Sequence, residues 1–498
     1  MCNVTRSITV VAVLAALVMT GGDAMAESSD PAAPRADVNT YPAPEGVVAS
    51  TRYAVEMDGR SVFIHETQAV NGGTAAFGSF DFRGTVAVAV RMTRPAGAPA
   101  PDVKIRPLSW GITPRVQGDT VHFTLDQPRH VTLEVDGFDH ALHLFANPID
   151  DEPVDPCDPA VIYFGPGVHD IETFDLRSGQ TLYLAGGAVL RCRLIPGEKP
   201  REEKNWAGQK VYRHLVTAAD ADGVRIRGRG VIDMSQLPWH ARSGIMIVRS
   251  RDVLIEGITI VDAPAWNIAT FECTDVRVEN VKLLGHRLNS DGVNLCNTQR
   301  GRVTRCFSRT NDDAFSVKTT RPAPAQPSAD IVVTDCVVWN ERARGIGITS
   351  ETRRDINDVT FRNIDIIRDF ANKPEWLCAA MAVLVSDSGT MRGITFEDIR
   401  IEHSEGTLFR GWIGSDMWGH DKTRGHVDGL TFRQVQYVGG GRPILQFDGF
   451  NAEHRFRNVT LDHVTIAGRE VGPDSDLVKL NPHVDPPTFL TSSQPAPP

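Results

Sequence analysis

The chain lacks the excess of basic residues that proteins use to bind nucleic acids or anionic membranes. Its 52 lysines and arginines are outnumbered by 62 aspartates and glutamates, which gives a net charge of −10. We therefore expect neither a nucleic acid nor an anionic membrane surface as a partner. The charge is compatible with a neutral substrate, or with an acidic substrate that a local patch of cations contacts.

No stretch of the sequence is apolar for long enough to span a bilayer. The apolar residues 8–19 follow Arg6 and precede the small residues Ala24-Met25-Ala26. This order predicts a signal peptide over residues 1–26, and a buried N-terminal helix is less favoured because nothing amphipathic follows. We expect a secreted or periplasmic monomer that does not insert into a membrane.

Helical periodicity is absent from residues 158–470, which instead repeat the pattern apolar-x-apolar-polar-x-apolar. Copies begin at Val253, Val276, Gly301 (degenerate), Ile331, Val359, Ile394, Leu430 and Val459. In the first five copies, the third residues are successively 23, 25, 30 and 28 residues apart. Short strands at this interval predict a parallel β-helix, whose turns stack about 4.8 Å apart. A leucine-rich repeat would need a Leu-x-Leu and asparagine ladder, which this sequence lacks.

Residues 45–150 carry a different pattern. Segments such as 85–91 and 120–125 alternate apolar and polar residues or are rich in β-branched ones, between glycines and prolines. This predicts a small β-sandwich. An acidic, Pro-rich linker follows at residues 147–156, and the Pro-rich residues 471–498 are predicted to form a loosely packed tail. The fold class is therefore all-β, a β-sandwich followed by a parallel β-helix.

No group of cysteines and histidines has the spacing of a zinc site. Cys157 and Cys192 could form a disulfide in an oxidising compartment. Cys306 and Cys336 occupy the same place in consecutive repeats and should be stacked neighbours. Buried free thiols are favoured there, because small apolar side chains suit such a position.

Three aspartates lie in two similar segments. Residues 289–293 read Asn-Ser-Asp-Gly-Val and residues 311–315 read Asn-Asp-Asp-Ala-Phe, so aligning them places Asp291 over Asp313, 22 residues later. Carboxylates stacked on neighbouring turns repel each other, and one should hold its proton to higher pH. Hydrolysis of a glycosidic bond needs such an acid beside ionised bases. Either segment alone is a common turn signal, but two at one repeat phase favour catalysis.

The order Asn289-Ser290-Asp291-Gly292, Asp312-Asp313, Gly345-Ile346-Gly347-Ile348 resembles the motif series of the polygalacturonases, glycoside hydrolases of family 28. Those motifs lie on successive turns of a right-handed parallel β-helix, and Lys318 fits the lysine that follows their Asp-Asp strand. A β-sandwich before the β-helix is similar instead to the dextranases of family 49, which share the three-aspartate site. The resemblance implies an inverting glycoside hydrolase, with Asp312 as general acid and Asp291 and Asp313 as the base.

Two features depart from the polygalacturonases. Ile346 stands where their motif has histidine, and the Arg-x-Lys that binds the substrate carboxylate is missing, because residues 382–386 carry no cation. An unpaired uronate charge would be costly to bury. The departures therefore favour a neutral or otherwise modified glycan over unesterified polygalacturonan, and a dextranase-like hydrolase of a neutral glucan is the alternative. Arg344, Arg353 or Arg410 could nevertheless supply a cation from another turn.

Several other residues are candidates for binding the substrate. They are Asn267, His286, Asn289, Lys318, Arg344 and Arg353. His286 could replace the missing histidine, and Asn267 either lines the groove or caps an internal asparagine ladder. The lysine and arginines could bind sugar hydroxyls or neutralise carboxylates. Trp266, Trp339 and Trp376 are candidate platforms for sugar rings, although buried tryptophans are as common.

Two functions from other classes remain open. A polysaccharide lyase would use the three aspartates as calcium ligands. A glycan-binding solenoid would have no catalytic use for them. We expect no metal and no cofactor, because Asp291, Asp312 and Asp313 are needed as acid and bases.

Overall fold

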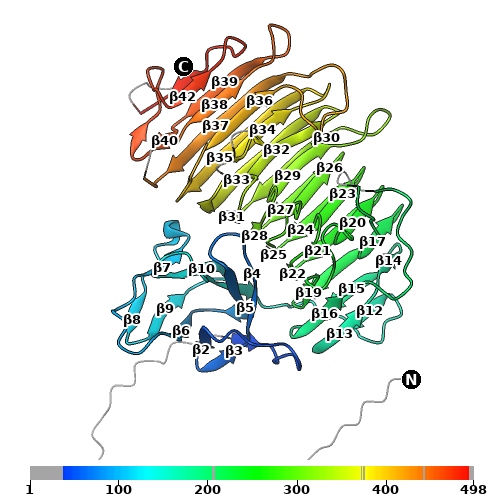
Figure 1. The fold of residues 1–498 in the computed structure, drawn as a ribbon, viewed down its shortest axis with the longest axis vertical. Helices are drawn as coiled ribbons and strands as arrows, with labels where there is room; N and C mark the ends of the chain where they lie inside the picture. The colour runs from blue at the N-terminus through cyan, green and yellow to red at the C-terminus, as the bar shows by residue number, and fades with distance from the viewer. Residues whose placement is uncertain (1–36, 205–207, 372, 374–375, 441–442, 493–498) are drawn as a thin grey trace, which may run out of the picture.

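The computed structural model describes residues 37–204, 208–371, 373, 376–440 and 443–492. A β-sandwich at the start of the chain lies beside a long coil of parallel strands (Figure 1). The predicted signal peptide, residues 1–26, lies outside the described residues. Within them, no helix is long and apolar enough to cross a membrane.

The β-sandwich is built from two sheets whose inner faces share one hydrophobic core, which includes Phe80, Val88 and Phe123. The first sheet comprises β1 (Asp37–Thr40), β4 (Ile64–Gln68), β5 (Thr74–Arg83), β7 (Val103–Arg106), β10 (Arg129–Val135) and β11 (Leu142–Pro148). The second comprises β2 (Tyr53–Met57), β3 (Arg60–Val62), β6 (Val86–Met92), β8 (Arg115–Gln117) and β9 (Thr120–Leu125). A short 3-10 helix, η1 (Leu108–Trp110), follows β7. The alternation of buried and exposed residues in β6 is the pattern that the sequence analysis used.

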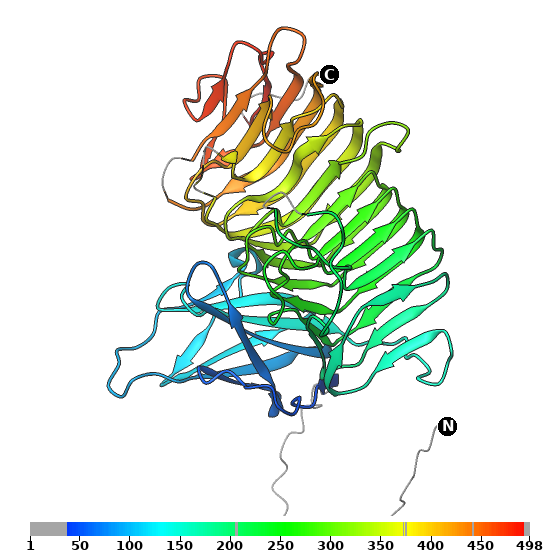
Figure 2. The same ribbon diagram turned by 45° about the vertical axis from the view of Figure 1, so that its right-hand side comes forward.

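The coil consists of parallel strands in two sheets and is a right-handed parallel β-helix, as predicted (Figures 1 and 2). One sheet comprises β14 (Phe174–Leu176), β17 (Val216–Ala219), β20 (Ile245–Val248), β23 (Ile268–Phe271), β26 (Val293–Cys296), β29 (Phe315–Thr319), β32 (Arg344–Thr352), β34 (Ala379–Val385), β36 (Phe409–Ile413), β38 (Leu445–Asp448) and β42 (Val478–Leu480). This eleven-stranded sheet carries the site described below.

The other sheet of the coil has 21 strands and wraps around its remaining faces. It comprises β12 (Val161–Phe164), β13 (Gly167–Ile171), β15 (Thr181–Leu184), β16 (Ala188–Cys192), β18 (Arg225–Gly228), β19 (Val231–Asp233), β21 (Arg251–Glu256), β22 (Thr259–Val261), β24 (Thr274–Glu279), β25 (Lys282–Leu284), β27 (Gln299–Thr304), β28 (Phe307–Thr310), β30 (Ser328–Thr334), β31 (Val337–Asn340), β33 (Ile356–Asp369), β35 (Met391–Ile401), β37 (Val427–Tyr437), β39 (Phe456–Asp462), β40 (Thr465–Ile466), β41 (Arg469–Glu470) and β43 (Thr488–Leu490).

The strand register confirms the repeat read from the sequence. The third residues of the first five copies pair one with the next, as Ile255, Val278, Val303, Val333 and Phe361. All five side chains are buried in the core of the coil. The repeat interval varies because the loops between strands differ in length, while the inward-facing position is kept from turn to turn.

Aromatic rings continue this row along the later turns. Phe361, Phe396 and Phe432 stack with ring centroids 5.1 and 5.4 Å apart, and Phe409 of the facing sheet meets Phe432 edge-on at 4.7 Å. Stacked and edge-to-face pairs add to the free energy gained from burying the rings. The row holds the turns of the coil in register beyond the site.

Of the two predictions for the cysteines, stacked free thiols at Cys306 and Cys336 are confirmed. Cys306 and Cys336 are buried free thiols on adjacent turns, and the Cys306 backbone N–H donates to Cys336 Sγ at 3.4 Å. The disulfide suggested for Cys157 and Cys192 is wrong, because Cys157 is exposed while Cys192 is buried in the coil, and the two are not bonded to each other.

In the described part of the predicted tail, residues 472–492 are not loosely packed. Its strand β42 pairs with β38, and β43 pairs with β39, so both continue the parallel sheets of the coil. Prolines between these strands were read as a sign of loose packing, but they lie in the connections rather than in the paired segments.

Buried charges join the β-sandwich to the coil. Glu134 of β10 binds Arg106 of β7 at 2.8 Å and Arg368 of β33 at 2.6 Å. Arg106 also binds Glu402, which follows β35. Each charge has its opposite within the network, which offsets the cost of removing it from water.

Candidate active site

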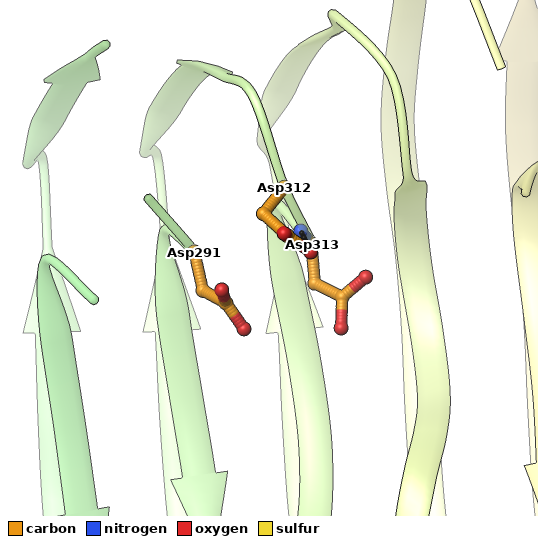
Figure 3. Close-up of side chains that lie close together, drawn as sticks. All are labelled: Asp291, Asp312 and Asp313. Atoms are coloured by element: carbon orange, nitrogen blue, oxygen red, sulfur yellow. Dashed lines mark hydrogen bonds between the residues drawn. The ribbon is translucent and has the colours of Figure 1, made fainter. Parts of the chain in front are cut away.

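The three aspartates lie where successive turns of the coil meet the eleven-stranded sheet. Asp291 precedes β26 on one turn, and Asp312 and Asp313 precede β29 on the next (Figure 3). Val293 pairs with Phe315, which is the predicted alignment. One oxygen from each carboxylate lies within 4.8 Å of one from each of the others. The predicted cluster of stacked carboxylates is therefore confirmed.

Close approach of the backbones at Gly292 makes this stacking possible. The Gly292 N–H donates to the Asp313 carbonyl at 2.8 Å. A Cβ at Gly292 would lie 2.2 Å from the Ala314 carbonyl oxygen, so any other residue would force the two turns apart. The conformation of the turn thus brings Asp291 and Asp313 to the same level of the coil.

Asn267, on the preceding turn of the coil, fixes the backbone of the Asp291 turn by hydrogen bonds. Its amide donates to the carbonyl oxygens of Ser290 and Asp291 at 3.2 and 3.0 Å, and its side chain is fully buried. The prediction that Asn267 binds substrate is therefore wrong. It is a positioning residue, because an amide committed to two backbone carbonyls cannot reach the cavity.

Backbone amides fix the carboxylate of Asp312. Its two oxygens accept from the N–H groups of Asn289 at 3.2 Å and of Asp313 at 3.0 Å. Asn289 adopts a left-handed conformation with φ of 65°, which aims its N–H at the neighbouring turn. Its side-chain amide also lies 3.4 Å from Asp291 Oδ1. Among the described residues, no cation forms an ion pair with Asp312.

Two cations are paired with the other two aspartates. Lys318 Nζ lies 3.2 Å from Asp291, 3.4 Å from Asp313 and 3.3 Å from Glu351. Arg344 lies 2.7 Å from Asp313 through Nε. Four carboxylates thus surround two cations, and this excess of negative charge favours the retention of protons.

The pKa values of the three aspartates differ in direction: those of Asp291 and Asp312 are raised, and that of Asp313 is lowered. Burial raises the pKa of Asp291 to about 8 against the opposing effect of Lys318, and Asp312 and Asp313 add to the rise. Burial, and then the charge of Asp313, raises the pKa of Asp312. Burial acts on Asp313 as well, but Arg344 and Lys318 outweigh it and hold the pKa of Asp313 below its usual value. The site therefore combines protonated and ionised carboxyls, as expected for acid and base.

A cavity of about 810 Å³ opens over the aspartates. Of the predicted site residues, its wall contains the following: Trp266, Asn289, Asp291, Asp312, Asp313, Lys318, Arg344 and Trp376. Five further residues, not expected from the sequence, also line it: Arg242, Arg342, Glu351, Asp416 and Trp418. Glu351 lies near the end of β32, and the other four lie on loops whose lengths differ from turn to turn, so no repeat phase could indicate them.

Four other candidates lie elsewhere. Arg353 binds Asp421 at 3.1 Å, and His286 Nδ1 lies 2.7 Å from Asp262; neither lines the cavity. Trp339 is fully buried at the contact between the coil and the β-sandwich. The assignments of Arg353, His286 and Trp339 to the substrate are therefore wrong. Arg410 is likewise engaged elsewhere, 2.6 Å from Asp448.

The turn after Asp312 and Asp313 presents Arg344, and not Ile346, to the site. Ile346 pairs with Phe315 and is fully buried in the core, so it cannot face the cavity. Arg344 contacts Asp313 from the same turn.

The carboxylates are closer than expected. An inverting hydrolase of the usual kind separates its two carboxyls by roughly 6.5–9.5 Å. One oxygen of each carboxylate lies within 4.8 Å of one oxygen of each of the others, which is closer than that separation. The spacing of the carboxylates by itself does not support inversion.

The same spacing would suit the oxygen ligands of a cation. Lys318 and Arg344 already place two positive charges against Asp291 and Asp313. A divalent ion would have to displace or approach both cations, which electrostatic repulsion opposes. The residues present therefore fit acid–base chemistry better than a calcium site.

The chain is similar to known proteins in sequence. Residues 174–436, more than half of the chain, match the model of glycosyl hydrolases family 28. The polygalacturonase of Juniperus ashei is 21% identical over 222 residues, 41% of each chain. The probable polygalacturonase of Vitis vinifera is 24% identical over 344 residues, 64% of each chain. The chain thus spans less than two thirds of the length of these relatives.

Two solved structures share the fold. Dex49A from Penicillium minioluteum aligns with a TM-score of 0.60 at 15% identity and covers 91% of this chain and 96% of its own. The exopolygalacturonase of Thermotoga maritima aligns with a TM-score of 0.51 at 18% identity, over 66% and 83%. The first alignment covers more of the chain than the coil alone contains, so it includes the β-sandwich.

The raised pKa of Asp291 predicts how stability depends on pH. The folded state binds this proton more tightly than the unfolded chain, whose aspartates have pKa values of about 3.9. The resulting stabilisation is complete below about pH 4 and is lost as the pH rises through about 8. Between pH 5 and 9 the melting temperature should fall, and it should fall less in Asp291→Asn. Asp126→Asn, at an exposed position, is the control; equal slopes for wild type and Asp291→Asn would contradict the assignment.

Proposed function

The chain belongs to glycosyl hydrolases family 28, and we propose that it is a secreted, polygalacturonase-like hydrolase of O-glycosidic bonds in a polysaccharide. The observation that carries this proposal is the division of the three clustered aspartates into groups with raised and lowered pKa. The relatives named as polygalacturonases support the substrate class. The predicted signal peptide supports secretion.

Asp312 acts as the general acid. Asp291 and Asp312 both have raised pKa values, so the cluster shares a retained proton between them. Asp312 is the one of the two that has no ion-pair partner among the described residues, and it lines the cavity. A proton on Asp312 can therefore pass to the glycosidic oxygen without breaking an ion pair.

Asp313 and Asp291 hold the attacking water. Arg344 and Lys318 keep Asp313 ionised, as a base requires. Lys318 contacts both carboxylates and so fixes their relative positions. Because the oxygens of Asp313 are engaged by two cations, they are poor nucleophiles, and water rather than a carboxylate attacks the sugar.

Replacing the acid should remove most of the activity. Asp312→Asn keeps the size of the side chain but cannot donate a proton, so kcat should fall about 10²- to 10⁴-fold. Release of reducing ends from polygalacturonan measures it, with Asp126→Asn expected to match the wild type. Near-full activity in Asp312→Asn would move the acid to Asp291, which is the next variant to test.

Direct attack by water inverts the anomeric centre. The first product of cleavage of an α-linked galacturonan should therefore be the β-anomer. Proton NMR during the first minutes of reaction, before mutarotation, distinguishes the anomers. A product that is initially α would show a covalent intermediate on one of the aspartates and refute the water-attack mechanism.

The cavity wall removes the reason for favouring a neutral glycan. That expectation rested on missing cations, but Arg242, Arg342 and Arg344 line the cavity. We therefore expect higher initial rates on unesterified polygalacturonan than on dextran and other neutral glucans, with rates unchanged by EDTA. Faster cleavage of a glucan would support the dextranase-like alternative. Dependence on calcium, with products that absorb as unsaturated uronates, would support the lyase.

A further inference from the structure

Arg342 is an arginine of the cavity wall that contributes nothing to the charge pairing of the three aspartates. It lies on the turn between β31 and β32, two residues before Arg344. Its guanidinium carbon lies 4.2 Å from the centroid of the Trp376 ring, and Trp376 also lines the cavity. A cation held over an indole face is restricted in orientation but keeps its N–H groups available.

The other arginines of the wall each form an ion pair. Arg344 binds Asp313, Arg242 donates to both oxygens of Glu198 at 2.7 and 2.6 Å, and Arg201 binds Glu203 at 2.9 Å. In the part of the chain that the structure describes, no carboxylate forms an ion pair with Arg342, and its buried Nε has no hydrogen-bond partner. A half-buried guanidinium in this state has donors to offer a ligand.

We propose that Arg342 recognises the carboxylate of a uronate residue of the substrate, next to the cleavage site, and so sets the preference for an unesterified chain. The inference deepens the proposed function and rests on it for the identity of the site. An arginine fork matches a carboxylate through two parallel hydrogen bonds, and a methyl ester removes the charge that strengthens them.

The charge of the cavity floor makes such a cation necessary. Asp291, Asp312, Asp313 and Glu351 lie around only two cations, Lys318 and Arg344. A uronate carboxylate that enters this space is repelled by the excess of negative charge. Arg342 places a positive charge on the cavity wall that is not ion-paired with the aspartates. This charge allows an acidic sugar to lie beside them.

The proposal is tested by the selectivity of Arg342→Gln between unesterified and methyl-esterified oligogalacturonates of the same length. On the unesterified substrate, kcat/KM should fall about 10- to 100-fold, as for a lost charge-assisted hydrogen bond. On the esterified substrate it should change by about threefold or less. Arg342→Lys, which keeps the charge but loses the fork, should lie between. Arg392→Gln, at an exposed ion pair on β35, is the matched control and should behave as the wild type.

Binding separates this proposal from the proposed function. In an Asp312→Asn background, titration calorimetry with unesterified trigalacturonate should show Kd raised about 10- to 100-fold by Arg342→Gln. If trigalacturonate binds with this dependence but the wild type cleaves nothing, the hydrolase proposal falls and the role of Arg342 stands. Equal losses on both oligomers, or no loss on either, would overturn the role of Arg342, as would failure of the unesterified oligomer to bind.

Discussion

In-register pairing of parallel turns is the constraint on which the rest of the molecule depends. Val293 pairs with Phe315, and the hydrogen bond from the Gly292 N–H to the Asp313 carbonyl continues this register toward the aspartates. The same pairing that buries a hydrophobic row inside the coil therefore forces like charges together on its outer face. Packing of the core supplies the free energy that holds these charges at close range. The catalytic geometry is in this sense a consequence of the register.

Charge balance, rather than distance, then gives each aspartate its role. Asp313 has two cations, Asp291 shares one of them, and Asp312 has backbone N–H groups only. The three carboxylates belong to one cluster, yet the positive charge next to each of them differs. An arrangement of this kind allows acid and base to coexist at one pH without a wide separation between them.

The parts of the fold that repeat could be read from the sequence, and the parts that do not repeat could not. The row of buried third residues of the repeat, such as Ile255 and Val278, follows from a period that every turn must keep. The alignment of Asp291 with Asp313 follows from the same period. Arg342 lies on a connecting loop, where no period applies. Trp339 looked like a sugar platform because its partner, the β-sandwich, is more than 150 residues away in sequence.

β42 and β43 are the last strands of the coil in the part of the chain that the structure describes. A parallel sheet that simply ended would leave a row of unpaired N–H and C=O groups on its last turn, which could pair with another molecule. After β42 the connection contains Pro482, Pro486 and Pro487, which have no N–H to donate. A further strand, from this chain or a second copy, would find few donors along that connection. The prolines that made this segment look unstructured therefore leave the connection itself poorly suited to pairing with another strand.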